Sequence, residues 1–174
     1  MRKWLTAFVI AAAVATPAAA ALPNGSKAPD FTTTGAVGGK AFKLHLADQL
    51  RNGPVVLYFF PKAFTKGCTL EAHAFSEAAK EFRKAGARVI GMSADDLPTL
   101  QRFSIEACRS AFPVATATAE TQKAYDVAWV EHPGLTTRTS YVIDRRGRIV
   151  MVHDDLDWSQ HVARTLEAVK ALKR

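Results

Sequence analysis

The chain has 174 residues, of which 48% are hydrophobic and 22% charged, and this is enough for one globular domain with its own buried core. Its formal net charge is +7, from 23 Lys and Arg residues against 16 Asp and Glu residues. Because the basic residues are spread along the chain, they form no stripe of the kind that binds nucleic acid, and no nucleic-acid partner is expected.

The first 21 residues have the three parts of a secretory signal peptide. Arg2 and Lys3 form a basic start, residues 4–15 are apolar, and small residues suited to cleavage follow Pro17. The sequence therefore predicts a cleaved signal peptide over 1–21 and a mature domain over 22–174 that is periplasmic or secreted. An uncleaved membrane anchor is the alternative, since residues 4–22 approach a span of about 20 residues, but the alanine content and Pro17 argue against it.

Strand and helix patterns alternate through the rest of the chain. Residues 30–34, followed by Gly35 and Gly38-Gly39, predict a short N-terminal β-hairpin. Apolar strands are expected at 54–60, 88–92 and 112–116, and helices from Cys68 to Gly86, at 97–107 and at 119–127. A second hairpin is expected from strands at 139–144 and 148–153, before a last helix capped by Asp157 whose core-facing residues are Val162, Leu166, Val169 and Leu172. The order predicts an α/β fold in which helices flank one central sheet.

Cys68 is the candidate nucleophile. It lies where a buried strand at 54–60 gives way to a helical pattern, so its thiol is expected in the first turn of that helix. Unpaired backbone N–H groups and the positive end of the helix dipole stabilise a thiolate at this place, and the thiolate is the reactive form of cysteine. The alternative is a buried structural thiol or half of an inert disulfide.

The segment that ends at Cys68 carries a family motif. Pro61, Thr65 and Cys68 fit the pattern Pro-x-x-x-Thr-x-x-Cys, and the flanking residues 58–62 and 68–72 fit as well. From about Gly25 to Leu172 the chain resembles peroxiredoxins of the bacterioferritin-comigratory, or Q-type, class. The resemblance implies a thioredoxin-like fold with a mixed sheet and an N-terminal hairpin extension, and a thiol peroxidase that forms a cysteine sulfenic acid and needs no metal or other cofactor.

The resemblance also implies which residues surround the sulfur. Pro61 is expected to shield the thiolate, the Thr65 hydroxyl to bond the sulfur or the peroxide, and the N–H groups of Gly67 and Cys68 to donate to the reacting oxygens. A guanidinium suits the fixed cation that the reaction needs, and peroxiredoxins carry theirs at the position of Arg138. The alternative for Arg138 is an arginine in solvent on an edge strand. Glu71 is expected to orient Arg138, although a glutamate in the first turn of a helix is also favourable by itself.

Cys108 is the second cysteine, near the end of the helix over 97–107. Q-type enzymes often place the resolving cysteine five residues after the peroxidatic one, but His73 stands there, and other members carry it in the next helix. Cys108 is therefore expected to form an intramolecular disulfide with Cys68 during turnover. The alternative is a one-cysteine enzyme in which Cys108 is an ordinary buried residue.

The expected partners are a hydroperoxide and a thioredoxin-like dithiol reductant, with no stable membrane insertion after signal removal and a monomeric state. One competing function is a periplasmic thioredoxin-like thiol-disulfide oxidoreductase, but Thr65 occupies the first position of its Cys-x-x-Cys motif. Another is a non-enzymatic domain stapled by one disulfide. The polar run from His153 to Asp157 predicts a turn rather than a metal site, and His45, His73, His132 and His161 have no ligand spacing.

Overall fold

The computed structural model describes residues 21–172, so the predicted signal peptide lies outside the described residues except for Ala21. Seven strands of this part form one sheet in the order β2-β1-β5-β4-β3-β6-β7. They are β1 (Thr32–Val37), β2 (Lys40–His45), β3 (Val55–Phe59), β4 (Arg88–Ser93), β5 (Val114–Thr116), β6 (Thr139–Ile143) and β7 (Ile149–Asp154). β3, β4 and β5 are parallel and the remaining pairs are antiparallel, which gives the predicted mixed sheet.

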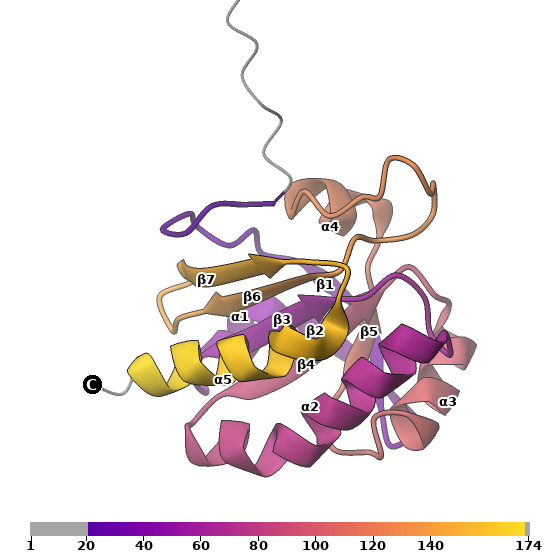
Figure 1. Cartoon of the computed structure of the whole chain (residues 1–174), viewed down its shortest axis with the longest axis horizontal. Coiled ribbons are helices and arrows are strands. Elements are labelled where there is room, and N and C mark those ends of the chain that lie inside the picture. Colours follow the sequence, from indigo (N-terminus) through magenta and orange to yellow (C-terminus); the bar gives the residue numbers. More distant parts are fainter. Residues whose placement is uncertain (1–20, 173–174) are drawn as a thin grey trace, which may run out of the picture.

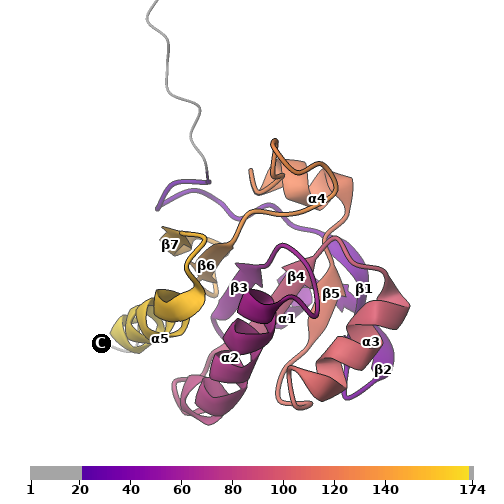
Figure 2. The same ribbon diagram turned by 45° about the vertical axis from the view of Figure 1, so that its right-hand side comes forward.

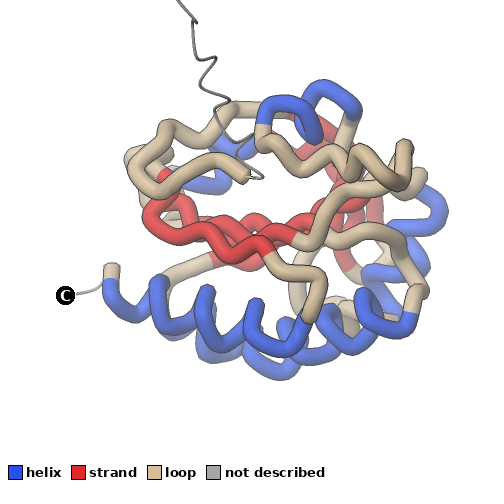
Figure 3. Tube along the Cα trace, turned by 45° about the horizontal axis from the view of Figure 1, so that its top comes forward, coloured by secondary structure: helices blue, strands red, loops and turns tan. Residues whose placement is uncertain are grey.

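Helices cover both faces of the sheet (Figures 1 and 3). One face carries α2 (Lys66–Lys84), α3 (Leu97–Glu106) and α5 (His161–Ala171), and Figure 2 shows α2 lying between the other two. The other face carries α1 (Leu46–Leu50) and α4 (Ala119–Ala124). A 3-10 turn, η1 (Trp158–Gln160), leads into α5. Among the described residues, none of the helices has the length and apolar character that crossing a bilayer requires.

Strand β3 lies inside the sheet, between β4 and β6, and it is apolar throughout because both of its faces are covered. Val56 and Tyr58, with Phe60 just beyond the strand, belong to the core beneath α2 and α3. Val55, Leu57 and Phe59 belong to the core beneath α1 and α4. This alternation follows from the two-residue period of a strand, and it places the carboxyl end of β3 at the centre of the fold.

The helix that carries Cys68 is fixed to the sheet by aromatic side chains. The rings of Tyr58 and Phe75 stack with centroids 4.3 Å apart, and Phe82 continues the contact toward the end of α2. Gly91 of β4 makes room for Tyr58, since a Cβ there would lie 2.9 Å from the Tyr58 ring. The first turn of α2 is thereby held in one position relative to β3.

Three expected boundaries differ from the structure. Asp157 caps η1 by accepting from the Ser159 N–H at 3.0 Å, so α5 begins only at His161, and Leu172 is 39% exposed instead of facing the core. β6 begins at Thr139 as expected but ends at Ile143, one residue before the expected end, and α4 ends at Ala124 instead of at 127. The N-cap of α3 is Asp96, which accepts from the Thr99 N–H at 2.9 Å.

Candidate active site

The loop between β3 and α2 sets the position of Cys68. The Phe60 N–H donates to the Met92 carbonyl at 2.9 Å, and the Phe60 carbonyl accepts from the Thr136 hydroxyl at 2.8 Å. Further on, the Ala63 N–H donates to the Asp95 carboxylate at 2.7 Å. These bonds fix the loop at both sides, and α2 then begins directly after its N-cap, Thr65.

Cys68 is the third residue of α2 and is 1% exposed. The N–H groups of the first residues of a helix have no carbonyl four positions earlier to bond with, so they remain available to an anion. Here these residues include Gly67 and Cys68, as the sequence predicts. The sulfur therefore lies in a nearly water-free place at the positive end of a 19-residue helix.

Arg138 reaches the sulfur from β6, the strand that pairs with β3. The register of the two strands sets Thr139 opposite Phe59, so the residue before β6 arrives beside the loop after β3. The Arg138 Nη2 donates to the Cys68 sulfur at 3.5 Å. Its Nε donates to the Leu156 carbonyl at 2.9 Å and its Nη1 to the Glu71 carboxylate. The guanidinium thus has all three nitrogens bound and is held against the thiol.

Glu71 lies one helical turn after Cys68 and its buried carboxyl group contacts the Arg138 guanidinium, as expected. Burial raises the pKa of Glu71 to about 8, although the neighbouring charge of Arg138 opposes this rise. Burial opposes the charge of Arg138 too, but Glu71 and Cys68 outweigh it and raise the pKa of the guanidinium. Arg138 is therefore a permanent cation at the sulfur.

The other predicted residues lie around this pair. A Cβ at Gly67 would come within 3.2 Å of Arg138 Nη2 and 3.8 Å of the Trp158 ring, so the absence of a side chain lets the guanidinium approach the helix. Pro61 begins the loop. The Thr65 hydroxyl donates to the Lys62 carbonyl at 3.0 Å and does not bond the sulfur, because its own loop supplies the nearer acceptor. Its predicted role toward the peroxide stays a prediction.

Cys108 lies in the turn that follows α3, where it is fully buried. Both cysteines are free thiols and belong to the same apolar cluster, together with Tyr58 and Phe103. Burial raises the pKa of the Cys108 thiol well above its usual range. In this reduced state Cys108 is therefore an uncharged buried side chain, and no disulfide joins it to Cys68.

His161 is the site residue that sequence reasoning missed. It is fully buried at the start of α5, with one ring nitrogen 2.8 Å from the Ser140 hydroxyl and 3.7 Å from Glu71. Metal-ligand spacing gave no reason to select it. The sequence does contain another signal. His161, Thr165 and Val169 are four residues apart and are the buried residues of α5, and two polar residues on the inner face of a helix indicate a buried hydrogen-bond network.

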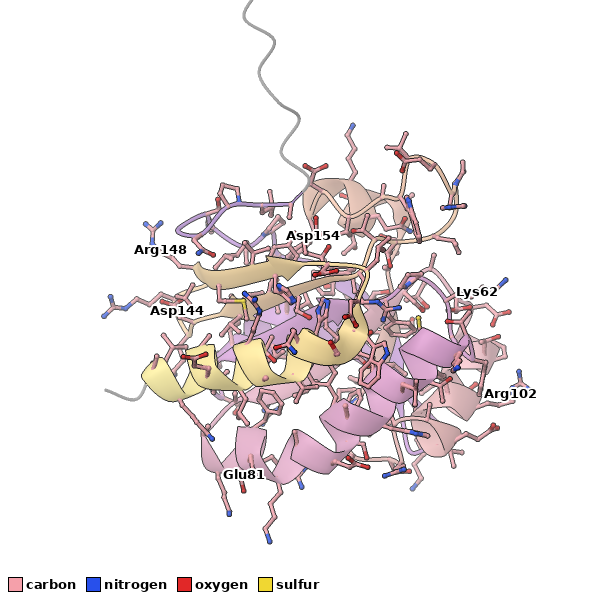
Figure 4. The ribbon with its side chains drawn as sticks, viewed as in Figure 1. Lys62, Glu81, Arg102, Asp144, Arg148 and Asp154 are labelled. Carbon is pink, nitrogen blue, oxygen red and sulfur yellow. The ribbon has the colours of Figure 1, made fainter. Side chains whose placement is uncertain are left out.

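The exposed surface beside the site is mixed in character. Figure 4 shows Lys62 and Arg102 projecting outward at the end of the molecule where α2 begins. The Phe64 ring, 39% exposed, lies under the Arg102 guanidinium at 5.3 Å and packs edge-on against Phe103 of α3 at 5.2 Å. Phe64 therefore connects the loop before Cys68 to the helix that leads to Cys108.

A thioredoxin-like fold with a buried thiol at a helix N-terminus and an arginine bound to it defines a class of cysteine-dependent redox enzymes. Residues 24–152 match the AhpC/TSA family. The chain belongs to this family, the peroxiredoxins, and is a thiol-dependent peroxidase, so the expected family resemblance is confirmed.

Individual relatives agree with this assignment. The chain is 31% identical to chloroplastic peroxiredoxin Q of Oryza sativa subsp. japonica, over 90% of this chain and 77% of that protein. It is 33% identical to chloroplastic peroxiredoxin Q of Arabidopsis thaliana, over 85% and 67% of the two chains. Its fold is similar to peroxidoxin BcpB of Mycobacterium tuberculosis, with a TM-score of 0.78 and 28% identity over 87% of this chain and 98% of that one. Peroxiredoxin Q of Xanthomonas campestris gives a TM-score of 0.70 and 26% identity, over 81% and 91%.

Proposed function

We propose that the protein is an exported peroxidase in which Cys68 reduces hydrogen peroxide and small organic hydroperoxides, and Cys108 then resolves the oxidised thiol. The observation that carries this proposal is the contact between Arg138 and the Cys68 sulfur, two residues that are both almost fully buried. A permanent cation and free helix N–H groups stabilise negative charge there both before and during the reaction.

The first step transfers one oxygen atom to sulfur. The Cys68 thiolate attacks one peroxide oxygen, the O–O bond breaks, and the other oxygen leaves as hydroxide or alkoxide and takes up a proton. Cys68 becomes a sulfenic acid, so the sulfur is oxidised and the peroxide is reduced to water or an alcohol. In this proposal Arg138 and the N–H groups of Gly67 and Cys68 donate to these oxygens while charge moves between them.

The second step forms a disulfide. The Cys108 sulfur attacks the sulfur of the Cys68 sulfenic acid, an S–S bond forms, and water leaves with the thiol proton. A thioredoxin-like dithiol then reduces the disulfide by thiol-disulfide exchange. Since both cysteines are buried in separate elements, the first turn of α2 and the turn after α3 have to open for this step.

Backbone strain beside Cys108 supports this opening. Arg109 and Ser110, the two residues after it, have φ angles of 50° and 56°, in the left-handed region that non-glycine residues seldom adopt. Residues in such conformations cost on the order of 1–3 kcal/mol each, which rearrangement of the turn would release. Cys108 therefore lies next to a segment that is prone to change its conformation.

Replacing Cys108 by serine should separate the two steps. The reaction of Cys68 with peroxide is expected to keep its rate, whereas turnover with a dithiol donor should fall at least about tenfold because the sulfenic acid is no longer resolved internally. Trapping of the oxidised protein followed by peptide mapping measures this. The wild type should give a peptide linked through Cys68 and Cys108, and the variant a sulfenic acid at Cys68.

A wild-type protein that accumulates sulfenic acid while Cys108 stays free would contradict resolution by Cys108. The enzyme would then be a one-cysteine peroxidase whose sulfenic acid is reduced directly by an external thiol. The assignment of Cys68 as the reacting thiol would survive that result.

Export is supported by the basic, apolar and small-residue segments within residues 1–21. When the full chain is expressed in a bacterial host, the protein recovered from the periplasm should begin close to Leu22. N-terminal sequencing measures this, and a protein that stays in the cytoplasm with Met1 in place would contradict export.

A further inference from the structure

One oxygen of the Glu71 carboxylate has no hydrogen-bond partner. Oε2 accepts from Arg138, but Oε1 is fully buried and receives no hydrogen bond from any described residue. The polar atom that faces it is Nδ1 of His161, 3.7 Å away. A buried carboxylate oxygen without a donor is costly, so this contact requires an explanation.

The partners of His161 determine where its ring proton lies. Nε2 is 2.9 Å from the Asp155 carbonyl oxygen, which can only accept, so Nε2 carries a hydrogen. Nδ1 is 2.8 Å from the Ser140 hydroxyl, which can donate to it. With a neutral ring and an ionised Glu71, two acceptor atoms would face each other with no hydrogen between them. One proton on either atom makes the contact attractive.

We propose that Glu71 and His161 hold one proton between them in the reduced enzyme at neutral pH, which leaves the positive charge of Arg138 uncompensated for the Cys68 thiolate. Without this proton, Glu71 and Arg138 would cancel and the site would carry no net positive charge toward the sulfur. With it, the three side chains together carry one positive charge. His161 is thus a positioning residue that acts through Glu71, and the inference rests on Cys68 being the thiol that reduces peroxide.

The surroundings favour this state. Burial raises the pKa of Glu71 to about 8 and lowers the pKa of His161 to about 4, which puts the proton on the carboxyl at neutral pH. Six other titratable or charged groups lie around the pair: Arg138, Cys68, Tyr58 of β3, His153 of β7, Asp155 and Asp157. The ring centroid of His153 is 4.5 Å from that of His161. Burial lowers the pKa of His153 and raises that of Tyr58, so neither adds a charge near pH 7.

The substitution Glu71→Gln tests the proposal because a carboxamide is an uncharged copy of the protonated carboxyl. Its oxygen can accept from Arg138 and its N–H can donate toward His161. The wild-type rate of Cys68 oxidation by hydrogen peroxide should fall above about pH 8, as the shared proton is lost. In Glu71→Gln the alkaline fall should disappear, because the carboxamide has no proton to lose. A rate that drops more than about tenfold at pH 7 would mean that Arg138 needs an ionised Glu71, and would overturn the proposal.

Infrared spectroscopy reads the proton without using the peroxidase reaction. The reduced wild type at pH 7 should show the band of a protonated carboxyl that Glu71→Gln removes and that the matched control Glu77→Gln, on the exposed side of α2, retains. Absence of that band would overturn the proposal even in a fully active enzyme. If the band were present in a protein whose Cys68 does not react with peroxide, the proposed function would be refuted but the shared proton would still be supported.

His161→Phe tests the second half of the pair. The phenyl ring fills the space but can neither accept nor hold the shared proton, so the alkaline fall should move to lower pH by about one unit. The matched control is Thr165→Val, which changes a buried hydroxyl one turn later in α5 that bonds only carbonyls of its own helix. An unchanged midpoint in His161→Phe, in protein that melts cooperatively, would remove His161 from the site.

Discussion

Replacing Cys68 by serine should reduce peroxide consumption to the background rate of the buffer. A serine hydroxyl fits the same space, but it stays protonated at neutral pH and is a far weaker nucleophile toward an O–O bond than a thiolate. The free helix N–H groups and Arg138 would remain in place and would have no anion to stabilise. The measurement is the second-order rate of peroxide loss under single-turnover conditions, with thiols counted before and after.

Cys108→Ser is the matched control for this result, because it removes a buried thiol from the same apolar cluster. It should keep the loss of one thiol equivalent in the first turnover. If Cys68→Ser retained peroxide reduction while Cys108→Ser lost it, the two cysteines would have exchanged roles, and the site described around Arg138 would not be the one that reacts.

Arg138→Lys should slow the reaction of Cys68 with peroxide by about 10²- to 10³-fold, the usual cost of removing one preorganised donor from a site that stabilises developing charge. The guanidinium bonds the Leu156 carbonyl, Glu71 and the Cys68 sulfur at the same time through three nitrogens. A lysine ammonium is a single nitrogen on a flexible stem, and it cannot reach all three with the same geometry. The net charge of the site is unchanged in this variant, so the fall in rate measures how much the reaction depends on the arrangement of the guanidinium donors.

The control for this prediction is Arg88→Lys at the start of β4, where an exposed arginine has one side-chain partner, Gln49. It should leave the peroxide rate unchanged. Both rates are measured as thiol loss after mixing reduced protein with hydrogen peroxide. A rate within about threefold of wild type for Arg138→Lys would show that a positive charge suffices and that the planar donor set is unnecessary.

The parts of the site that depend on local sequence were predictable. Cys68 follows a buried strand and opens a helix, and these two features lie within a dozen residues of the chain. Arg138 comes from the strand beside β3, but its identification rested on the family resemblance, because 70 residues separate it from Cys68. The α/β fold with one sheet follows from the order of strand and helix patterns, whereas the mixed sheet was expected from the family resemblance.

Other contacts were not predictable because they join distant segments. The pairing of Glu71 with His161 joins α2 to α5, and no spacing along the chain indicates it. Leu172 was wrongly predicted to face the core. η1 delays the start of α5, the buried residues of this helix are His161, Thr165 and Val169, and Leu172 is its C-cap. The helix α1 has only five residues, too few for helical periodicity to be read.

The seclusion of the Cys68 sulfur also governs which reagents reach it. Because only 1% of the residue is open to solvent, hydrogen peroxide is expected to reach the sulfur more readily than bulky alkylating agents. Electrophiles that modify ordinary surface cysteines should therefore spare this enzyme. A brief peroxide pulse should not create sensitivity to them, because the proposed oxidation converts Cys68 into a sulfenic acid and then into a disulfide with Cys108, and neither form is alkylated by thiol reagents.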